Sequence, residues 1–214
     1  MNYHTITYPD QNNGDGLRVV LWLSGCSHHC YNCQNPQTWD ANSGIPFDES
    51  AKKELFRELD KDYISGLTLT GGDPLFESNL DGVLDLVTEF NKRYNFQKVD
   101  SANPCKMGVS EVENTDEIRL SFPNKSIWLY SGYQWEECQP FNEDGLLKPD
   151  KFAPNLQKIL QKRYEVISRC NVMVDGRYID SQRNPSKKWA GSDNQRVIDV
   201  QQSLIKGKVV LYCD

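Results

Sequence analysis

Short runs of apolar residues alternate along this chain with longer segments of helical periodicity. The run LRVVLWLS (17–24) combines β-branched residues with Trp22 and is bounded by GDG and GC, so it predicts a strand that is buried on both faces. Further short apolar runs predict strands at 66–70, 126–131, 171–176, 195–200 and 207–213. Strands buried on both faces are typical of parallel sheets.

Three longer segments carry apolar residues at intervals of three and four, and each predicts a helix. They span residues 47–63, 79–95 and 155–170. In the first of them, Asp48 or Ser50 is placed to cap the amino terminus of the helix. Because the helices fall between predicted strands, the sequence predicts an α/β fold with a mainly parallel sheet.

Two segments, 96–125 and 136–154, interrupt this alternation. Both are polar and acidic, and neither shows a clear periodicity. Neither holds enough apolar residues to form a core of its own. We therefore expect a single domain over residues 1–214, with surface insertions at these two places.

Polar motifs stand where four of the predicted strands end. GCSHHCYNC follows the first strand, TGGDP the second, SGY (131–133) the third, and Asp175 with Gly176 the fourth. The carboxyl ends of parallel strands lie at one edge of the sheet, and ligands bind there. We expect the four motifs to meet in one site.

Charge and cysteine content narrow the classes of function. The 30 acidic residues outnumber the 24 basic ones, and the net charge of −6 argues against nucleic acid as the main partner. The sequence has no apolar run of the ~18 residues that a membrane span requires, and its first residues lack the pattern of a secretory signal. Seven cysteines without such a signal fit metal-bound thiols in a reducing compartment, so we expect a cytoplasmic protein.

Cys26, Cys30 and Cys33 lie within eight residues, one thiol fewer than a structural metal site usually has. Zinc is one interpretation, with His28 or His29 as the fourth ligand. Zinc sites usually draw on two separated pairs of ligands, however, and the sequence offers no second pair. A [4Fe–4S] cluster is the other interpretation, because three thiolates would hold three irons and leave the fourth iron open for chemistry.

The spacing Cys-x3-Cys-x2-Cys after a first strand resembles the signature of the radical S-adenosylmethionine superfamily, and TGGDP stands where that superfamily has a Gly-Gly-acidic motif. Further motifs are similar to those of the activating proteins of anaerobic (class III) ribonucleotide reductases. They are MNYHTITYP, GC-x-H-x-C followed by Asn35 and Thr38-Trp39, TLTGGDPL, IWLYSGY, NVMVDGRY and GSDNQRVIDV.

This resemblance implies an incomplete β/α barrel and a reaction. A [4Fe–4S] cluster would cleave S-adenosylmethionine reductively, and the 5′-deoxyadenosyl radical would take a hydrogen atom from a glycine of the reductase large subunit. The remaining glycyl radical would then start ribonucleotide reduction. The implied partners are that subunit and a low-potential electron donor such as flavodoxin.

The resemblance also implies the site residues. Cys26, Cys30 and Cys33 would hold the cluster, while His28 and His29 are expected to be plain loop residues. S-adenosylmethionine would contact Asn32, Cys33, Gln34, Thr70, Gly71, Gly72, Asp73, Ser131 and Asp175. In this interpretation the two glycines allow close approach of the backbone, and the Asp73 carboxylate accepts a hydrogen bond from the ammonium group of the cofactor.

Two alternatives remain at this point. One is an activating enzyme for another glycyl-radical enzyme, such as the pyruvate formate-lyase type. The other is a binding module without catalysis, stabilised by zinc or by an iron–sulfur cluster.

Overall fold

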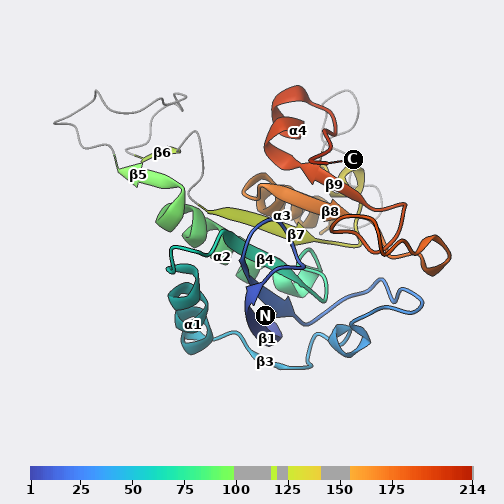
Figure 1. Ribbon diagram of the computed structural model, residues 1–214, viewed down its shortest axis with the longest axis horizontal. Coiled ribbons are helices and arrows are strands. Elements are labelled where there is room, and N and C mark those ends of the chain that lie inside the picture. Colours follow the sequence, from blue (N-terminus) through green and yellow to red (C-terminus); the bar gives the residue numbers. More distant parts are fainter. Residues whose placement is uncertain (99–116, 120–124, 141–154, 214) are drawn as a thin grey trace.

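The computed structural model describes residues 1–98, 117–119, 125–140 and 155–213. Its main sheet has seven strands, and the four central ones run parallel (Figure 1). In spatial order the strands are β3 (Ile45–Pro46), β1 (Asn2–Asp10), β2 (Arg18–Leu23), β4 (Gly66–Gly71), β7 (Ser126–Tyr130), β8 (Val172–Asp175) and β9 (Arg196–Asp199). The edge strands β3 and β9 do not pair with each other, so the sheet is open over the described residues.

The predicted strands from 17–24 to 195–200 are all present, and the mainly parallel α/β sheet is confirmed. The prediction for 207–213 was wrong. Leu211 makes only an isolated bridge to Ile198 of β9, because α4 (Val200–Lys206) and the left-handed Gly207 turn the chain back across the edge of the sheet. The antiparallel strands β1 and β3 were not predicted.

Three of the four helices match the predicted ones. They are α1 (Glu49–Leu59), α2 (Leu80–Tyr94) and α3 (Leu156–Ser168). Asp48 is the amino-terminal cap of α1, since its side chain accepts hydrogen bonds from the backbone N–H groups of Ser50 and Ala51. Short 3-10 turns lie at Pro36–Thr38, Glu77–Asn79, Trp135–Cys138 and Asp180–Gln182.

The helices cover one face of the sheet and form the main core with it. Leu21, Leu69, Leu129 and Met173 come from the four parallel strands, and all are fully buried in this cluster. Cys138 and Cys170 are buried in the same core, where free cysteines often lie as small apolar residues. Packing of this face therefore holds the parallel strands in register.

Arg18 lies on the opposite face of the sheet and is completely buried. Its guanidinium donates to Thr68 Oγ1 at 2.6 Å, to the Leu67 carbonyl at 2.6 Å and to the Ser126 carbonyl at 2.9 Å, and it stands 5.4 Å from the ring centroid of Trp128. Burial lowers the pKa of Arg18 to about 10. The hydrogen bonds bind the first residue of β2 to β4 and β7.

The two expected insertions lie partly outside the described residues. Within 96–125, β5 (Phe96–Lys98) pairs antiparallel with β6 (Glu117–Arg119) in a separate small sheet, which Figure 1 shows beyond the amino ends of the parallel strands. Of 136–154, residues 136–140 are described, and Cys138 belongs to the main core. A single domain with two insertions stays a prediction.

Candidate functional site

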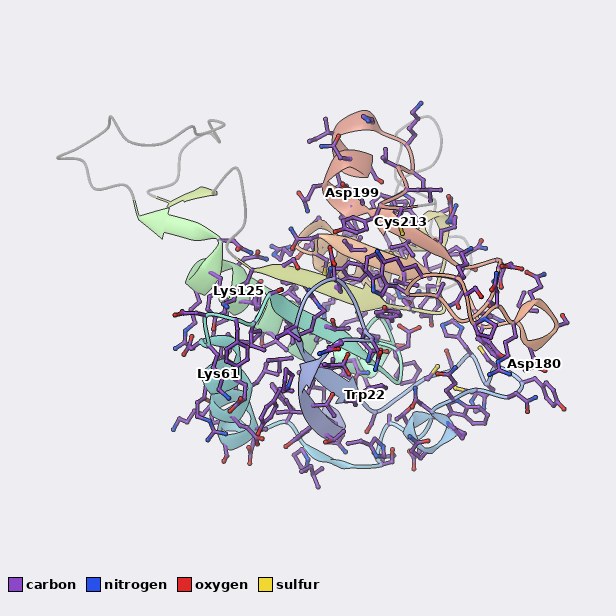
Figure 2. The ribbon with its side chains drawn as sticks, in the orientation of Figure 1. Trp22, Lys61, Lys125, Asp180, Asp199 and Cys213 are labelled. Atoms are coloured by element: carbon purple, nitrogen blue, oxygen red, sulfur yellow. The ribbon has the colours of Figure 1, made fainter. Side chains whose placement is uncertain are left out.

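The four predicted motifs meet at the carboxyl edge of the parallel strands. Figure 2 shows Asp180, in the loop after β8, beyond this edge, whereas Lys61 and Lys125 lie at the amino ends of the strands. Ser131 links the motif after β7 to the Asp73 carboxylate, and the Gly176 N–H after β8 donates to the Tyr133 carbonyl. The predicted convergence of the motifs is thus confirmed.

The cysteine loop (residues 24–35) is fixed at its base by the segment that follows it. The Gly25 N–H donates to the Thr38 carbonyl at 2.7 Å, and the Cys26 N–H donates to the Trp39 carbonyl at 3.0 Å. The Trp39 ring packs against the His29 ring, with 4.7 Å between centroids. Trp39 Nε1 is buried and has no hydrogen-bond partner among the described residues.

Backbone N–H groups act on the thiols of the cysteine loop. The Asn35 N–H donates to Cys33 Sγ at 3.4 Å, and the backbone N–H groups of His28 and Tyr178 act to lower the pKa of the Cys26 and Cys30 thiols. Burial nevertheless raises the pKa of the Cys26 thiol to about 11, and burial also raises that of Cys30. Burial makes the charged thiolate form costly. A bound metal ion would offset this cost with its positive charge, so these thiols are suited to binding a metal.

The spacing of the thiols does not suit a single zinc ion. Tetrahedral ligands with Zn–S bonds of ~2.3 Å would lie about 3.8 Å apart. In the described part of the chain, the one group of three possible ligands whose atoms all lie within 4.8 Å of one another is Cys26, His28 and Asp73. The three cysteines form no such group, so their sulfurs are not placed as three ligands of one zinc ion. In a [4Fe–4S] cluster each thiolate would hold its own iron, so the sulfurs need not lie so close together.

The glycines of TGGDP let the second motif approach the cysteine loop. Gly71 has a φ of +98°, and a Cβ on Gly72 would lie 2.6 Å from the Gly25 carbonyl oxygen. The Gly72 N–H donates to the Leu23 carbonyl at 2.7 Å, and the Asp73 N–H donates to the Gly25 carbonyl at 2.8 Å. The close approach seen here is to the backbone of the neighbouring loop, and the approach of these glycines to a ligand stays a prediction.

The Asp73 side chain is at the centre of the site and is 2% exposed. Its Oδ1 accepts from the Leu75 N–H at 2.8 Å and from Ser131 Oγ at 2.9 Å. Its Oδ2 accepts from the Gly132 N–H at 2.9 Å and from His28 Nε2 at 2.8 Å. One carboxylate therefore binds three of the four motifs together.

The expectation that His28 is a plain loop residue was wrong. Its side chain is 2% exposed, and its ring meets the Tyr133 ring edge to face at 4.4 Å between centroids. His29, by contrast, is exposed in the loop with a φ of +47°. The sequence did place the Asp73 and SGY motifs at the same edge of the sheet as His28. However, His28 and Asp73 are 45 residues apart, and no local sequence pattern indicates that their side chains meet.

Asp175 joins the end of β8 to two other segments. Its carboxylate accepts from the Trp135 N–H at 2.8 Å and from Arg196 Nε at 3.0 Å, and the side chain is 1% exposed. Arg196 also pairs with Glu136, and it lowers the pKa of that carboxyl group by hydrogen bonding. Gln195 closes the late loop (residues 176–195), donating to the Gly176 carbonyl and accepting from the Gly191 N–H.

The remaining predicted contacts with S-adenosylmethionine lie at the same edge but differ in exposure. Asn32, with a φ of +54°, and Gln34 are exposed in the cysteine loop, whereas Thr70 is half-buried at the end of β4. Ser131 is 6% exposed and is engaged by Asp73. The assignment of these residues to a cofactor stays a prediction.

The chain is similar in sequence to an iron–sulfur family and to known proteins. The family described as "4Fe-4S single cluster domain" matches residues 12–104 and 110–198. The anaerobic ribonucleoside-triphosphate reductase-activating protein of Enterobacteria phage T4 is 35% identical over 198 residues, which cover 92% of this chain and 93% of the relative. The chain belongs to this family of activating proteins.

Two bacterial relatives agree with the assignment. The activating protein of the same name from Escherichia coli (strain K12) is 31% identical over 199 residues, with 92% of this chain and 97% of the relative covered. That of Pasteurella multocida is 31% identical over 197 residues, covering 91% and 95%. No helix in the described part of the chain is both long and apolar enough to cross a membrane.

Proposed function

We propose that this protein is a radical S-adenosylmethionine enzyme that generates a glycyl radical on the large subunit of an anaerobic ribonucleotide reductase. The observation that carries the proposal is the carboxyl edge itself, where three free, half-buried thiols lie in a loop hydrogen-bonded to the GGDP motif. Membership in the activating-protein family supports the choice of partner. In this proposal, the open sheet is a partial β/α barrel of the radical S-adenosylmethionine type.

The residues present fit a [4Fe–4S] cluster. Cys26, Cys30 and Cys33 would hold it, and nearby backbone N–H groups, among them that of Asn35 at 3.4 Å from Cys33 Sγ, would stabilise the thiolates. Trp39 Nε1 is a buried donor without an acceptor among the described residues, and a cluster sulfur would supply one.

When bound, the reduced cluster supplies one electron that splits S-adenosylmethionine into methionine and a 5′-deoxyadenosyl radical, which takes a hydrogen atom from a glycine Cα to give 5′-deoxyadenosine and a glycyl radical. The chain itself binds and orients the reactants. The TGGDP backbone and Asp73 would hold the methionine end, while Asp175 and the late loop would border the opening for the glycine segment. We place this activity in the cytoplasm, with flavodoxin or a similar protein as electron donor.

Anaerobic reconstitution tests the proposal. The purified protein should bind about four irons and four sulfides per chain, which the composition of the proposed cluster requires. Addition of S-adenosylmethionine to the reduced protein should change the electron paramagnetic resonance signal of the cluster. With the reductase large subunit present, 5′-deoxyadenosine should form together with a glycyl radical on that subunit. A colourless protein that binds zinc, or a cluster signal indifferent to S-adenosylmethionine, would refute the proposal.

A further inference from the structure

His28 lies in the middle of the cysteine loop, but its side chain is buried. It lies two residues after Cys26 and two before Cys30, yet its ring turns inward and reaches the Asp73 carboxylate at 2.8 Å. Both side chains are only 2% exposed. This distance is that of a hydrogen bond, so a proton joins the two groups and no ion is needed between them.

The remaining donors to Asp73 come from outside the cysteine loop. Leu75 follows the GGDP motif, while Ser131 and Gly132 belong to the motif after β7. His28 is therefore the one described side chain that connects the cysteine loop to this carboxylate. An ionised carboxylate offers about four acceptor positions, and here four donor groups occupy them.

Gly132 provides an independent observation. A Cβ on this residue would lie 2.3 Å from Cδ2 and 2.6 Å from Nε2 of His28, far inside van der Waals contact. The imidazole ring therefore fits only because Gly132 has no side chain. The Tyr133 ring packs edge to face against the His28 ring, and Arg163 covers Tyr133 with its guanidinium 3.7 Å from the ring centroid. The pocket holds the His28 ring in one orientation.

We propose that His28 is a positioning residue, which locks the cysteine loop and the Asp73 carboxylate in the arrangement that binds S-adenosylmethionine, and that Gly132 is required to admit its ring. This inference rests on the proposed function for the ligand, but the contact between His28 and Asp73 does not. An alternative is that His28 merely occupies the position of the cofactor's ammonium group. The crowded Asp73 carboxylate disfavours this alternative, because the donors on both oxygens already fix its orientation.

The test compares variants of the anaerobically reconstituted protein by equilibrium dialysis with S-adenosylmethionine. His28→Ala should raise the Kd by about tenfold or more, the effect of losing about 1.4 kcal/mol. His28→Gln retains an N–H donor at the position of Nε2, so its Kd should stay near that of the wild type. His29→Asn, a change in the same loop that tolerates the positive φ of this position, is the matched control and should bind normally.

A second variant makes the test independent of simple loss of structure. Gly132→Ala should weaken binding as His28→Ala does, and the double variant should bind no more weakly than either single one, because both changes break the same contact. If His28→Ala does not fold, His28→Gln against His28→Phe decides the question, since phenylalanine fills the space without a donor. Binding of His28→Ala equal to or tighter than that of the wild type would overturn the proposal.

A wrong proposed function can be distinguished from a wrong assignment of His28. If the wild type holds a cluster but does not bind S-adenosylmethionine, the proposed reaction is refuted. The His28 contact is then judged from urea unfolding of the cluster-free protein. There, the double variant should lose less stability than the sum of the two single variants. Strict additivity would show that Gly132 and His28 do not act through one contact and would overturn the inference.

Discussion

The Asp73 carboxylate offers a direct test of how the site is held together. Asp73→Asn keeps the size of the side chain but replaces one acceptor oxygen with an NH2 group. Whichever way the amide turns, that NH2 group faces donors, either Leu75 N–H and Ser131 Oγ or Gly132 N–H and His28 Nε2. At least one hydrogen bond to a charged acceptor is lost, and a buried N–H is left without a partner.

The magnitude follows from these contacts. A hydrogen bond to a charged group contributes about 1.5–3 kcal/mol, and an unsatisfied buried donor costs about 1–3 kcal/mol. Because a hydroxyl or imidazole can partly readjust, we expect a loss of stability at the lower end of the sum of these two terms, about 2.5 kcal/mol. A typical domain has only about 5–15 kcal/mol in total. The variant should therefore unfold at a markedly lower urea concentration.

The assay is urea unfolding of the cluster-free protein under reducing conditions, followed by tryptophan fluorescence. Asp81→Asn is the matched control, because Asp81 is exposed on α2 and pairs with Lys162 at the surface. An Asp73→Asn midpoint as high as that of Asp81→Asn would refute the reasoning. In the reconstituted protein, the same Asp73→Asn variant should bind S-adenosylmethionine about 10-fold or more weakly, because the carboxylate no longer holds the cysteine loop and the motif after β7 in place.

Three further predictions test other parts of the structure. Cys30→Ala should lose most of the iron after reconstitution, whereas Cys213→Ala should retain it; equal iron in the two, by colorimetric assay, would contradict the assignment of the ligands. Arg18→Met should lower the free energy of unfolding by at least about 2 kcal/mol, because carbonyls on β4 and β7 lose their buried donor; a urea midpoint unchanged from the wild type would show that these hydrogen bonds contribute little. Trp39→Phe removes one buried N–H, so the cluster should keep its iron but have a more negative reduction potential in an anaerobic titration; an unchanged potential would mean that this donor does not reach the cluster.

Much of the fold could be predicted because buried parallel strands have a distinct sequence pattern. LRVVLWLS and SIWLYS are mostly apolar, because helices cover one face of the sheet and other residues cover the second. β1 carries polar and apolar residues together, NYHTITYPD, and lies next to the two-residue edge strand β3, so its composition resembles that of a loop. The segment 207–213 has the composition of a strand, but composition does not determine which edge is available for pairing.

The site was predictable as a location and less so as a set of contacts. Ligand sites form at the carboxyl ends of parallel strands. This rule correctly predicted that the cysteine loop, Asp73, Ser131 and Asp175 lie together, because it depends only on strand direction. Which side chains bind one another depends on the separation of the loops, and that is set by packing of glycines such as Gly72 and Gly132. The pairing of His28 with Asp73 therefore emerged only from the structure.

The hydrogen bonds of the carboxyl edge also bear on the order of assembly. In a zinc finger, the metal supplies the free energy of folding, and the ligands have no fixed positions without it. Here the base of the cysteine loop is bonded to Thr38 and Trp39, and its middle is bonded to Asp73 through His28. All these partners are protein groups attached to the main sheet. The loop that would receive the cluster is thus positioned by the fold itself, so removal of iron should leave the carboxyl edge assembled and ready for reconstitution.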